Sequence, residues 1–147
     1  YKGEATGSDK HFSFALVADE RPVREVHVFE AAIDAMSYAS LKIMYCKDWR
    51  KIAYLSLAGV FASKRANVVP VALEQFLKDH SQITKVVLHL DNDKVGRLCT
   101  ATLKELLQKD YKIVDNPPPV GKDFNDFLLS YLKIARPKLK RERSDVR

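Results

Sequence analysis

The sequence predicts an α/β domain in which a mostly parallel β-sheet of about four core strands is covered by helices on both faces. Two observations support this fold class. Short apolar stretches with the composition of strands recur along the chain, and longer stretches with helical periodicity lie between them. Strands that alternate with helices favour a parallel sheet buried on both faces. The predicted core strands cover residues 25–29, 51–57, 86–90 and 111–115.

The helices follow from local signals. In the first helix, apolar residues recur at helical spacing with small residues between them, which predicts a side that packs on the sheet; these residues are Ile33, Met36, Leu41 and Met44. Pro70 suits the first turn of the second helix, because its fixed φ matches the helical value. The predicted helices cover about 31–46, 70–80, 95–109 and 124–134.

The segments around these elements are predicted less directly. A strand over 12–17 leads into the domain, and residues 60–69 form a basic loop or short helix with Lys64 and Arg65 exposed. His89 lies on a predicted strand and is expected in the core or at an edge of the sheet. The core is also expected to hold three aromatic side chains that are not used to stack on bases, those of Phe12, Phe14 and Phe61.

One domain accounts for most of the chain. The 147 residues suffice for a single core of ordinary size. Residues 136–147 carry six Lys or Arg and two acids, a net charge of +4 out of +6 for the chain. Such a tail suits an enzyme that contacts nucleic-acid phosphates, and a flexible solubilising end is the alternative. We expect a lead-in segment over 1–10, a catalytic domain over 11–135 and a basic tail or linker over 136–147.

Composition excludes several classes of protein. The hydrophobic fraction of 46% and the charged fraction of 30% are ordinary globular values. Cys46 and Cys99 are isolated, so neither a structural zinc site nor a disulfide framework is expected. No stretch approaches the roughly 18 apolar residues of a membrane span, and no signal peptide is visible, which predicts a cytoplasmic protein without a membrane partner. The chain begins at Tyr1 and not at Met, so a piece of a longer protein is expected.

Two carboxylates follow directly after the predicted strand 86–90. Asp91 and Asp93 lie two residues apart there, and Gly96 admits a tight turn into the next helix. The carboxyl ends of parallel strands are where α/β sheets bind ligands. Two anionic side chains held there repel each other unless a cation lies between them, and oxygen ligands suit Mg²⁺ or Mn²⁺. The alternative is a solvated acidic turn that ends a strand.

A third acid, Glu30, follows the predicted strand 25–29. It would share the strand-end edge with Asp91 and Asp93. The alternative is that Glu30 only supports the start of the next helix through the helix dipole, in which case its loss costs about 0.3–1 kcal/mol. Asp34, one turn later, can be an ordinary first-turn acid.

Polar residues gather again before the last helix. Asp123 can be the N-cap of that helix, with Asn125 and Asp126 in its first turn. Capping needs a single carboxylate or amide, and this segment offers three such groups. A further acidic corner of a metal site is therefore the functional alternative.

Taken together and in this order, these segments resemble the Toprim domain, the catalytic module shared by bacterial primases, topoisomerases and some nucleases. The amino-acid sequences of these motifs are most similar to those of the Toprim-like domains in primase-type proteins of plasmids and other mobile elements. The resemblance covers about residues 7–135 and departs from the family at Val95, where relatives often carry alanine. It rests on G-S-D-K-H-F-S-F at 7–14, F-E-A-A-I-D-A at 29–35, L-S-L-A-G at 55–59, L-D-N-D-K-V-G-R at 90–97 and G-K-D-F-N-D at 121–126.

The resemblance implies a Rossmann-like fold and Mg²⁺- or Mn²⁺-dependent nucleotidyl transfer on DNA, above all primer synthesis in replication or mobilisation. It implies Glu30 as the general acid or base, or as a further metal ligand. The implied metal ligands are Asp91, Asp93, Asp123 and Asp126; the implied phosphate contacts are Lys122, Arg97 and Lys94; the implied supporting residues are Asp34, Gly96 and Asn125. The partners would be a single-stranded DNA template, nucleotides and the other domains of a larger primase, helicase or relaxase-type protein.

Other functions remain open at this level. A nuclease can use the same metal cage, and a catalytically idle domain can bind nucleic acid or a partner protein. A topoisomerase needs a nucleophilic tyrosine, and none of the six tyrosines lies in a suggestive setting. An EF-hand loop is excluded because it needs an oxygen ligand where Val95 stands and a glutamate where Thr102 stands. A haloacid dehalogenase-type phosphatase stays a minor alternative, since its D-x-D motif normally follows the first core strand.

Overall fold

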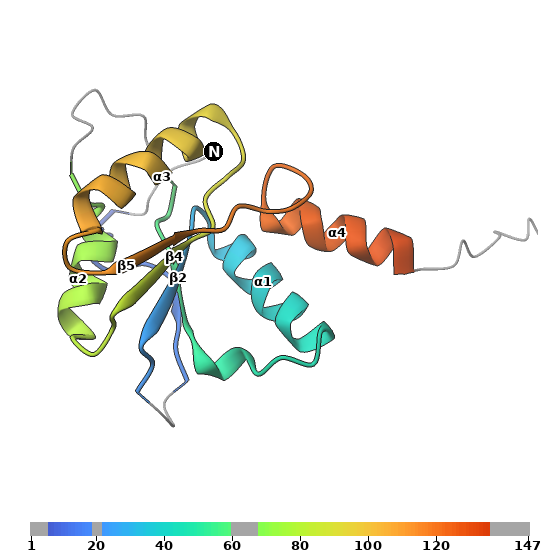
Figure 1. The fold of residues 1–147 in the computed structure, drawn as a ribbon, viewed down its shortest axis with the longest axis horizontal. Coiled ribbons are helices and arrows are strands. Elements are labelled where there is room, and N and C mark those ends of the chain that lie inside the picture. The colour runs from blue at the N-terminus through green and yellow to red at the C-terminus, as the bar shows by residue number, and fades with distance from the viewer. Residues whose placement is uncertain (1–5, 19–21, 60–67, 136–147) are drawn as a thin grey trace, which may run out of the picture.

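A computed structural model describes residues 6–18, 22–59 and 68–135. The described chain forms a five-stranded sheet in the order β1-β3-β2-β4-β5 (Figure 1). The four strands β2 to β5 are parallel, and β1 pairs antiparallel with β3 at one edge. The predicted fold class is therefore confirmed. The strands are β1 (Ala15–Leu16), β2 (Glu25–Phe29), β3 (Ala53–Ser56), β4 (Lys85–Leu88) and β5 (Lys112–Asp115).

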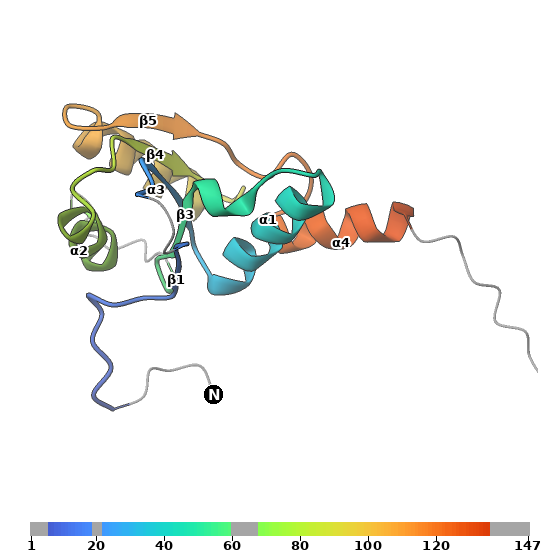
Figure 2. The same cartoon turned by 90° about the horizontal axis from the view of Figure 1, so that it is seen from below.

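Helices cover both faces of this sheet, as the alternation of elements predicted. Helices α2 and α3 lie on one face, and α1 and α4 lie on the other (Figures 1 and 2). Helix α1 follows β2, and α3 follows β4, within a few residues, so the start of each of these two helices lies near the carboxyl end of a strand. The helices are α1 (Ala32–Met44), α2 (Val71–Asp79), α3 (Lys94–Leu107) and α4 (Phe124–Ala135), with a 3-10 turn η1 (Trp49–Lys51) before β3.

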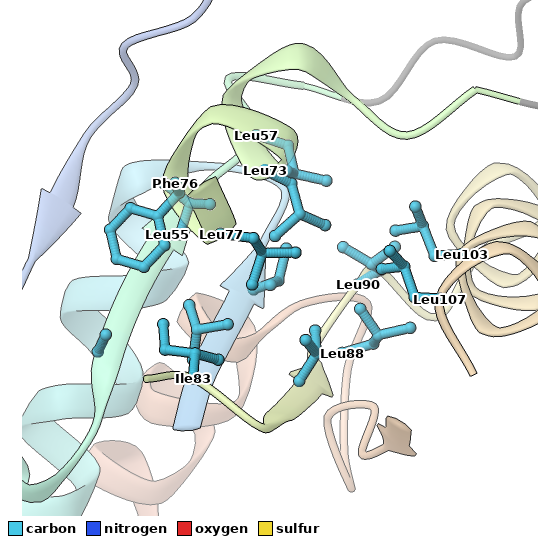
Figure 3. Close-up of a cluster of buried hydrophobic side chains, with 14 of the residues drawn as sticks. Leu55, Leu57, Leu73, Phe76, Leu77, Ile83, Leu88, Leu90, Leu103 and Leu107 are labelled. Carbon is cyan, nitrogen blue, oxygen red and sulfur yellow. The ribbon is translucent and has the colours of Figure 1, made fainter. Parts of the chain in front are cut away.

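Strand alternation divides the core into two layers. Val26 and Val28 of β2 face α2 and α3, whereas Phe29 faces α1 and α4. Figure 3 shows the first layer, in which Leu73 and Phe76 of α2 lie among leucines from the sheet and from α3. The three central strands β3, β2 and β4 are almost entirely buried, as expected for a parallel sheet covered on both faces, whereas the edge strands β1 and β5 are partly exposed. This rigid support fixes the backbone at the strand ends.

Two histidines form a polar pair inside the second layer. His27 Nδ1 in β2 and His89 Nε2, directly after β4, are 2.6 Å apart, and His89 Nδ1 donates to the Asn116 carbonyl oxygen at 2.7 Å. Burial lowers the pKa of His27 to about 4 and holds that of His89 well below its usual range. His89 is thus a core residue, as predicted. Its pairing with His27 was not visible in the sequence, because each histidine is isolated there.

The predicted apolar side of α1 is wrong except at Leu41. Ile33 is 50% exposed, and Met36 and Met44 are exposed as well. Besides Leu41, the helix packs through small and polar residues, namely Asp34, Ala35, Ser37 and Ala39. Small side chains let α1 approach the sheet and α4 closely, so packing distance and not apolar periodicity selects the buried face.

The lead-in strand is also shorter than predicted. Of residues 12–17, only 15 and 16 form β1, and Phe12 is 71% exposed. Phe14 is exposed too, so the core prediction for both aromatics is wrong. A two-residue edge strand gives their rings no second layer to pack against. Phe61, with Lys64 and Arg65, lies outside the described residues.

The domain boundaries stay predictions. The proposed tail 136–147 and residues 1–5 of the proposed lead-in lie outside the described residues, as does most of the predicted loop 60–69. Within the described part of the chain, no helix is long and apolar enough to cross a membrane.

Candidate metal and phosphate site

The Asp91–Asp93 segment lies where β4 passes into α3. Asp91 is buried, and Asp93 caps α3, its Oδ1 accepting the Gly96 N–H at 2.9 Å. A Cβ atom on Gly96 would collide with the Asp91 carbonyl oxygen and lie 2.9 Å from the carbonyl carbon of the same residue. Glycine is therefore required for α3 to start this close to Asp91. The first turn of α3 therefore holds the Asp93 carboxylate and packs against the Asp91 backbone.

The Lys122 ammonium bridges these two carboxylates. Lys122 Nζ lies 2.8 Å from Asp91 Oδ2 and 3.3 Å from Asp93 Oδ2. The pair of acids raises the pKa of Lys122, while the Gly96 amide, and to a smaller extent Lys122, lower that of Asp93. The backbones meet as well, since the Asn92 N–H donates to the Lys122 carbonyl oxygen at 2.7 Å. The segments around 91 and 122 therefore form one unit.

Glu30 lies at the neighbouring strand end, after β2. Its backbone carbonyl accepts the Gly59 N–H at 2.8 Å, which joins the ends of β2 and β3. The side-chain oxygen Oε1 is buried and has no hydrogen-bond partner among the described residues. Burial, and then the negative charge of Asp91, raise the pKa of Glu30 to about 7. Near neutral pH this carboxyl group can therefore both give and take a proton.

The predicted supporting residues Asp34 and Asn125 meet across the domain. Asp34 Oδ1 accepts the Asn125 N–H at 3.1 Å, and Ser37 Oγ donates to Asn125 Oδ1 at 3.3 Å. Burial raises the pKa of Asp34 to about 6. Asp34 is thus more than a first-turn acid, because it links α1 to the start of α4. This link was not predicted, since the partners are 91 residues apart.

Asp123 and Asp126 use their carboxylates to shape the α4 start. Asp123 Oδ1 accepts the Asp126 N–H at 2.7 Å, as the N-cap alternative predicted. Asp126 Oδ2 accepts the Lys122 N–H at 3.3 Å. Gly121 before them has a φ of 86°, and a Cβ there would lie 2.7 Å from Asp126 Cβ. A role for either acid as a metal ligand stays a prediction.

The two other basic candidates differ in their surroundings. Arg97 donates to Asp115 Oδ1 at 2.9 Å and to the Leu90 carbonyl oxygen at 2.8 Å, so it ties the ends of β4 and β5 together. Lys94 is the first residue of α3 and is exposed. The prediction that either residue contacts phosphate remains untested by these contacts.

The carboxylate oxygens of this site are the type of ligand that a hard divalent cation prefers, although the described side chains do not form a complete set of metal ligands. Across the described residues, no three His, Cys, Asp or Glu side chains converge closely enough to hold a metal ion. Asp91 and Asp93 nevertheless already share one cation, the Lys122 ammonium, and Glu30 Oε1 nearby lacks a partner. Two carboxylates suffice for Mg²⁺, which usually keeps several of its waters.

The fold and the site together define an α/β domain with a carboxylate-rich edge at the carboxyl ends of its parallel strands. A family model described as Toprim-like matches residues 27–128. This chain therefore belongs to the Toprim-like family, and the resemblance that its motifs indicated is confirmed.

Two further comparisons are more limited. Among solved structures, the primase fragment of the bacteriophage T7 primase-helicase protein is 18% identical, with a TM-score of 0.47 over 74% of this chain. This chain spans 40% of that fragment. No curated protein matches this chain at a significant level.

Proposed function

We propose that this domain carries out metal-assisted nucleotidyl transfer on nucleic acid, with primer synthesis on single-stranded DNA as the reaction. One observation carries the proposal: Glu30 lies with Asp91 and Asp93 at the adjacent ends of two parallel strands, where burial and the negative charges of the two aspartates raise the pKa of Glu30 to about 7. Membership of the Toprim-like family supports the same chemistry. The sequences of three motifs resemble those of primase-type family members, which supports the primase assignment; these motifs lie at 29–35, 90–97 and 121–126.

Each residue of the site has a distinct task in this mechanism. Asp91 and Asp93 would hold Mg²⁺ or Mn²⁺, with Asp123 or Asp126 assisting through water. The ion, when bound, neutralises charge on the phosphate oxygens. The Glu30 carboxyl group takes the proton from the attacking hydroxyl group as pyrophosphate leaves the α-phosphorus, because a carboxyl group with a pKa of about 7 is well matched to proton transfer at neutral pH. The Asp34–Asn125 link keeps the loop before α4 in place beside these acids.

Metal binding is the first test. We expect Mn²⁺ to bind the wild-type protein weakly and Asp91→Asn/Asp93→Asn at least about a hundredfold more weakly, since unit charges 4 Å apart at an effective dielectric constant of about 20 interact by about 4 kcal/mol. Isothermal calorimetry measures this difference. The control is Glu105→Gln/Asp110→Asn, which removes two exposed acids from α3 and the turn after it and should bind as wild type. Equal affinity of all three proteins would refute the metal assignment.

The reaction itself is tested on circular single-stranded DNA with nucleoside triphosphates and Mn²⁺. Primer synthesis yields labelled oligonucleotides and leaves the circle intact, which is the result we expect. Linearised circles without oligonucleotides would favour the nuclease alternative, because the same cage can cleave a phosphodiester. If the protein binds Mn²⁺ but forms neither oligonucleotides nor linear DNA, the result would support a domain that binds nucleic acid or a partner without turnover.

A further inference from the structure

Lys122 occupies the position that a metal ion would compete for. Its ammonium group contacts Asp91 Oδ2 at 2.8 Å and Asp93 Oδ2 at 3.3 Å. A Mg²⁺ ion bound to the same oxygens would lie about 2.0–2.1 Å from them. Two cations cannot share these oxygens at such distances without strong repulsion. Metal binding therefore requires the ammonium group to leave.

Hydrogen bonds hold the Lys122 backbone in place, whereas its side chain is largely exposed and can change rotamer. The Lys122 carbonyl oxygen accepts the Asn92 N–H at 2.7 Å, and the Lys122 N–H donates to Asp126 Oδ2 at 3.3 Å. Gly121 in its left-handed conformation packs against Asp126. The Lys122 side chain, by contrast, is 55% exposed. The ammonium group can thus move by rotation about its four-carbon stem while the Cα atom stays beside the site.

The two carboxylates, of Asp91 and Asp93, differ in how much a nearby cation stabilises them. The Asp91 side chain is 9% exposed and that of Asp93 is 39% exposed, so Asp91 has little water to screen its charge. The partly buried Glu30 adds further negative charge beside it. Without a metal ion, the Lys122 ammonium is the cation that the described residues bring to this pair.

We propose that Lys122 is an exchangeable internal cation: it neutralises Asp91 and Asp93 in the metal-free domain, yields to the divalent cation, and then binds the phosphate group that arrives with that cation. This inference rests on the proposed function. It couples metal binding to phosphate binding through one side chain, because the ammonium group becomes available to phosphate once the metal displaces it. The phosphate belongs to a nucleoside triphosphate or to the nucleic-acid backbone, which present the same chemistry.

The metal arm of the test compares Mn²⁺ affinities by calorimetry. Lys122→Met should bind Mn²⁺ roughly threefold to thirtyfold more tightly than wild type, because a partly exposed competing charge is removed. Lys104→Met removes the same charge from an exposed lysine of α3 to which no role in the site is assigned, and it is expected to change the affinity by less than about twofold. Lys122→Gln serves as a second variant if Lys122→Met does not fold. Equal or weaker Mn²⁺ binding in the folded Lys122 variants would overturn the exchange.

The phosphate arm measures fluorescence anisotropy of two labelled probes in saturating Mn²⁺, a nucleoside triphosphate and an oligothymidylate without terminal phosphates. Lys122→Met should weaken binding of the probe that supplies the phosphate by roughly tenfold, although it tightens metal binding. If Lys122 had only a structural role, Lys122→Met would weaken the binding of both Mn²⁺ and the phosphate probe, or of neither. Unchanged binding of both probes would overturn the phosphate step. Absence of Mn²⁺ binding in the wild type would overturn the metal assignment itself, an outcome distinct from either failure of Lys122.

Discussion

Replacing Glu30 by Gln is expected to abolish most of the activity and, at the same time, to stabilise the metal-free domain at alkaline pH. The activity should fall by roughly 10²–10⁴-fold, the usual contribution of a positioned proton-transfer group. The stability should rise at pH 8 by about 1–2 kcal/mol, after allowance for partial solvent screening of this half-buried group. Function and stability thus change in opposite directions at one residue.

The sign follows from the raised pKa. In the folded domain the pKa of Glu30 is about 7, above the value of 4.5 for a free glutamate. The folded state therefore binds the proton more tightly, and the contribution of this group to stability is complete below about pH 4.5 and is lost as the pH rises through 7. Glutamine, which is never charged, avoids that loss. The gain should accordingly vanish at pH 4.5.

Thermal unfolding in EDTA at pH 4.5 and pH 8 checks the stability, and primer synthesis on single-stranded DNA checks the rate. Glu74→Gln is the matched control, since Glu74 is an exposed glutamate on α2 that pairs with Lys78 at 2.7 Å. It should be neutral or slightly destabilising at both pH values. A Glu30→Gln variant that is destabilised at pH 8 would show that the helix-dipole role dominates. Unchanged turnover would remove Glu30 from the mechanism.

Replacing Gly96 by Ala should destabilise the domain by about 3 kcal/mol or more, at the upper end of overpacking effects. Alanine is the better helix former by about 1 kcal/mol. The new Cβ, however, meets backbone atoms of Asp91, which cannot rotate away as a side chain can. Either α3 moves away from β4 or the Asp91–Asp93 segment shifts. Mn²⁺ binding should therefore weaken together with stability.

Urea unfolding measures the stability term. Gly59→Ala is the first control: Gly59 has a φ of 99° but no atom within 4 Å of its would-be Cβ, so it tests backbone strain without collision and should cost about 1 kcal/mol. Val95→Ala is the second, since Val95 is exposed in the same helical turn and should change stability by less than about 0.5 kcal/mol. A Gly96→Ala variant as stable as wild type would contradict the close approach of α3 to Asp91.

Much of the fold was accessible from the sequence because its signals are local. The strands at 25–29 and 111–115 needed only their apolar composition, and α4 needed only the cap at Asp123. The order of acids after strands, together with the parallel sheet, placed Glu30 near Asp91 and Asp93. Strand ends on one edge of a parallel sheet are adjacent whatever the details of packing.

Only the tertiary structure decided how those residues meet. The buried side of α1 is decided by how closely the helix approaches its neighbours. The small residues Ala35 and Ala39 are therefore buried, whereas Ile33 is exposed. The His27–His89 pair and the Asp34–Asn125 link join residues far apart in the chain, and no local pattern marks them. The family resemblance implied Lys122 as a phosphate contact, which stays a prediction. That its ammonium group lies between two carboxylates depends on side-chain distances, which are set when the domain packs.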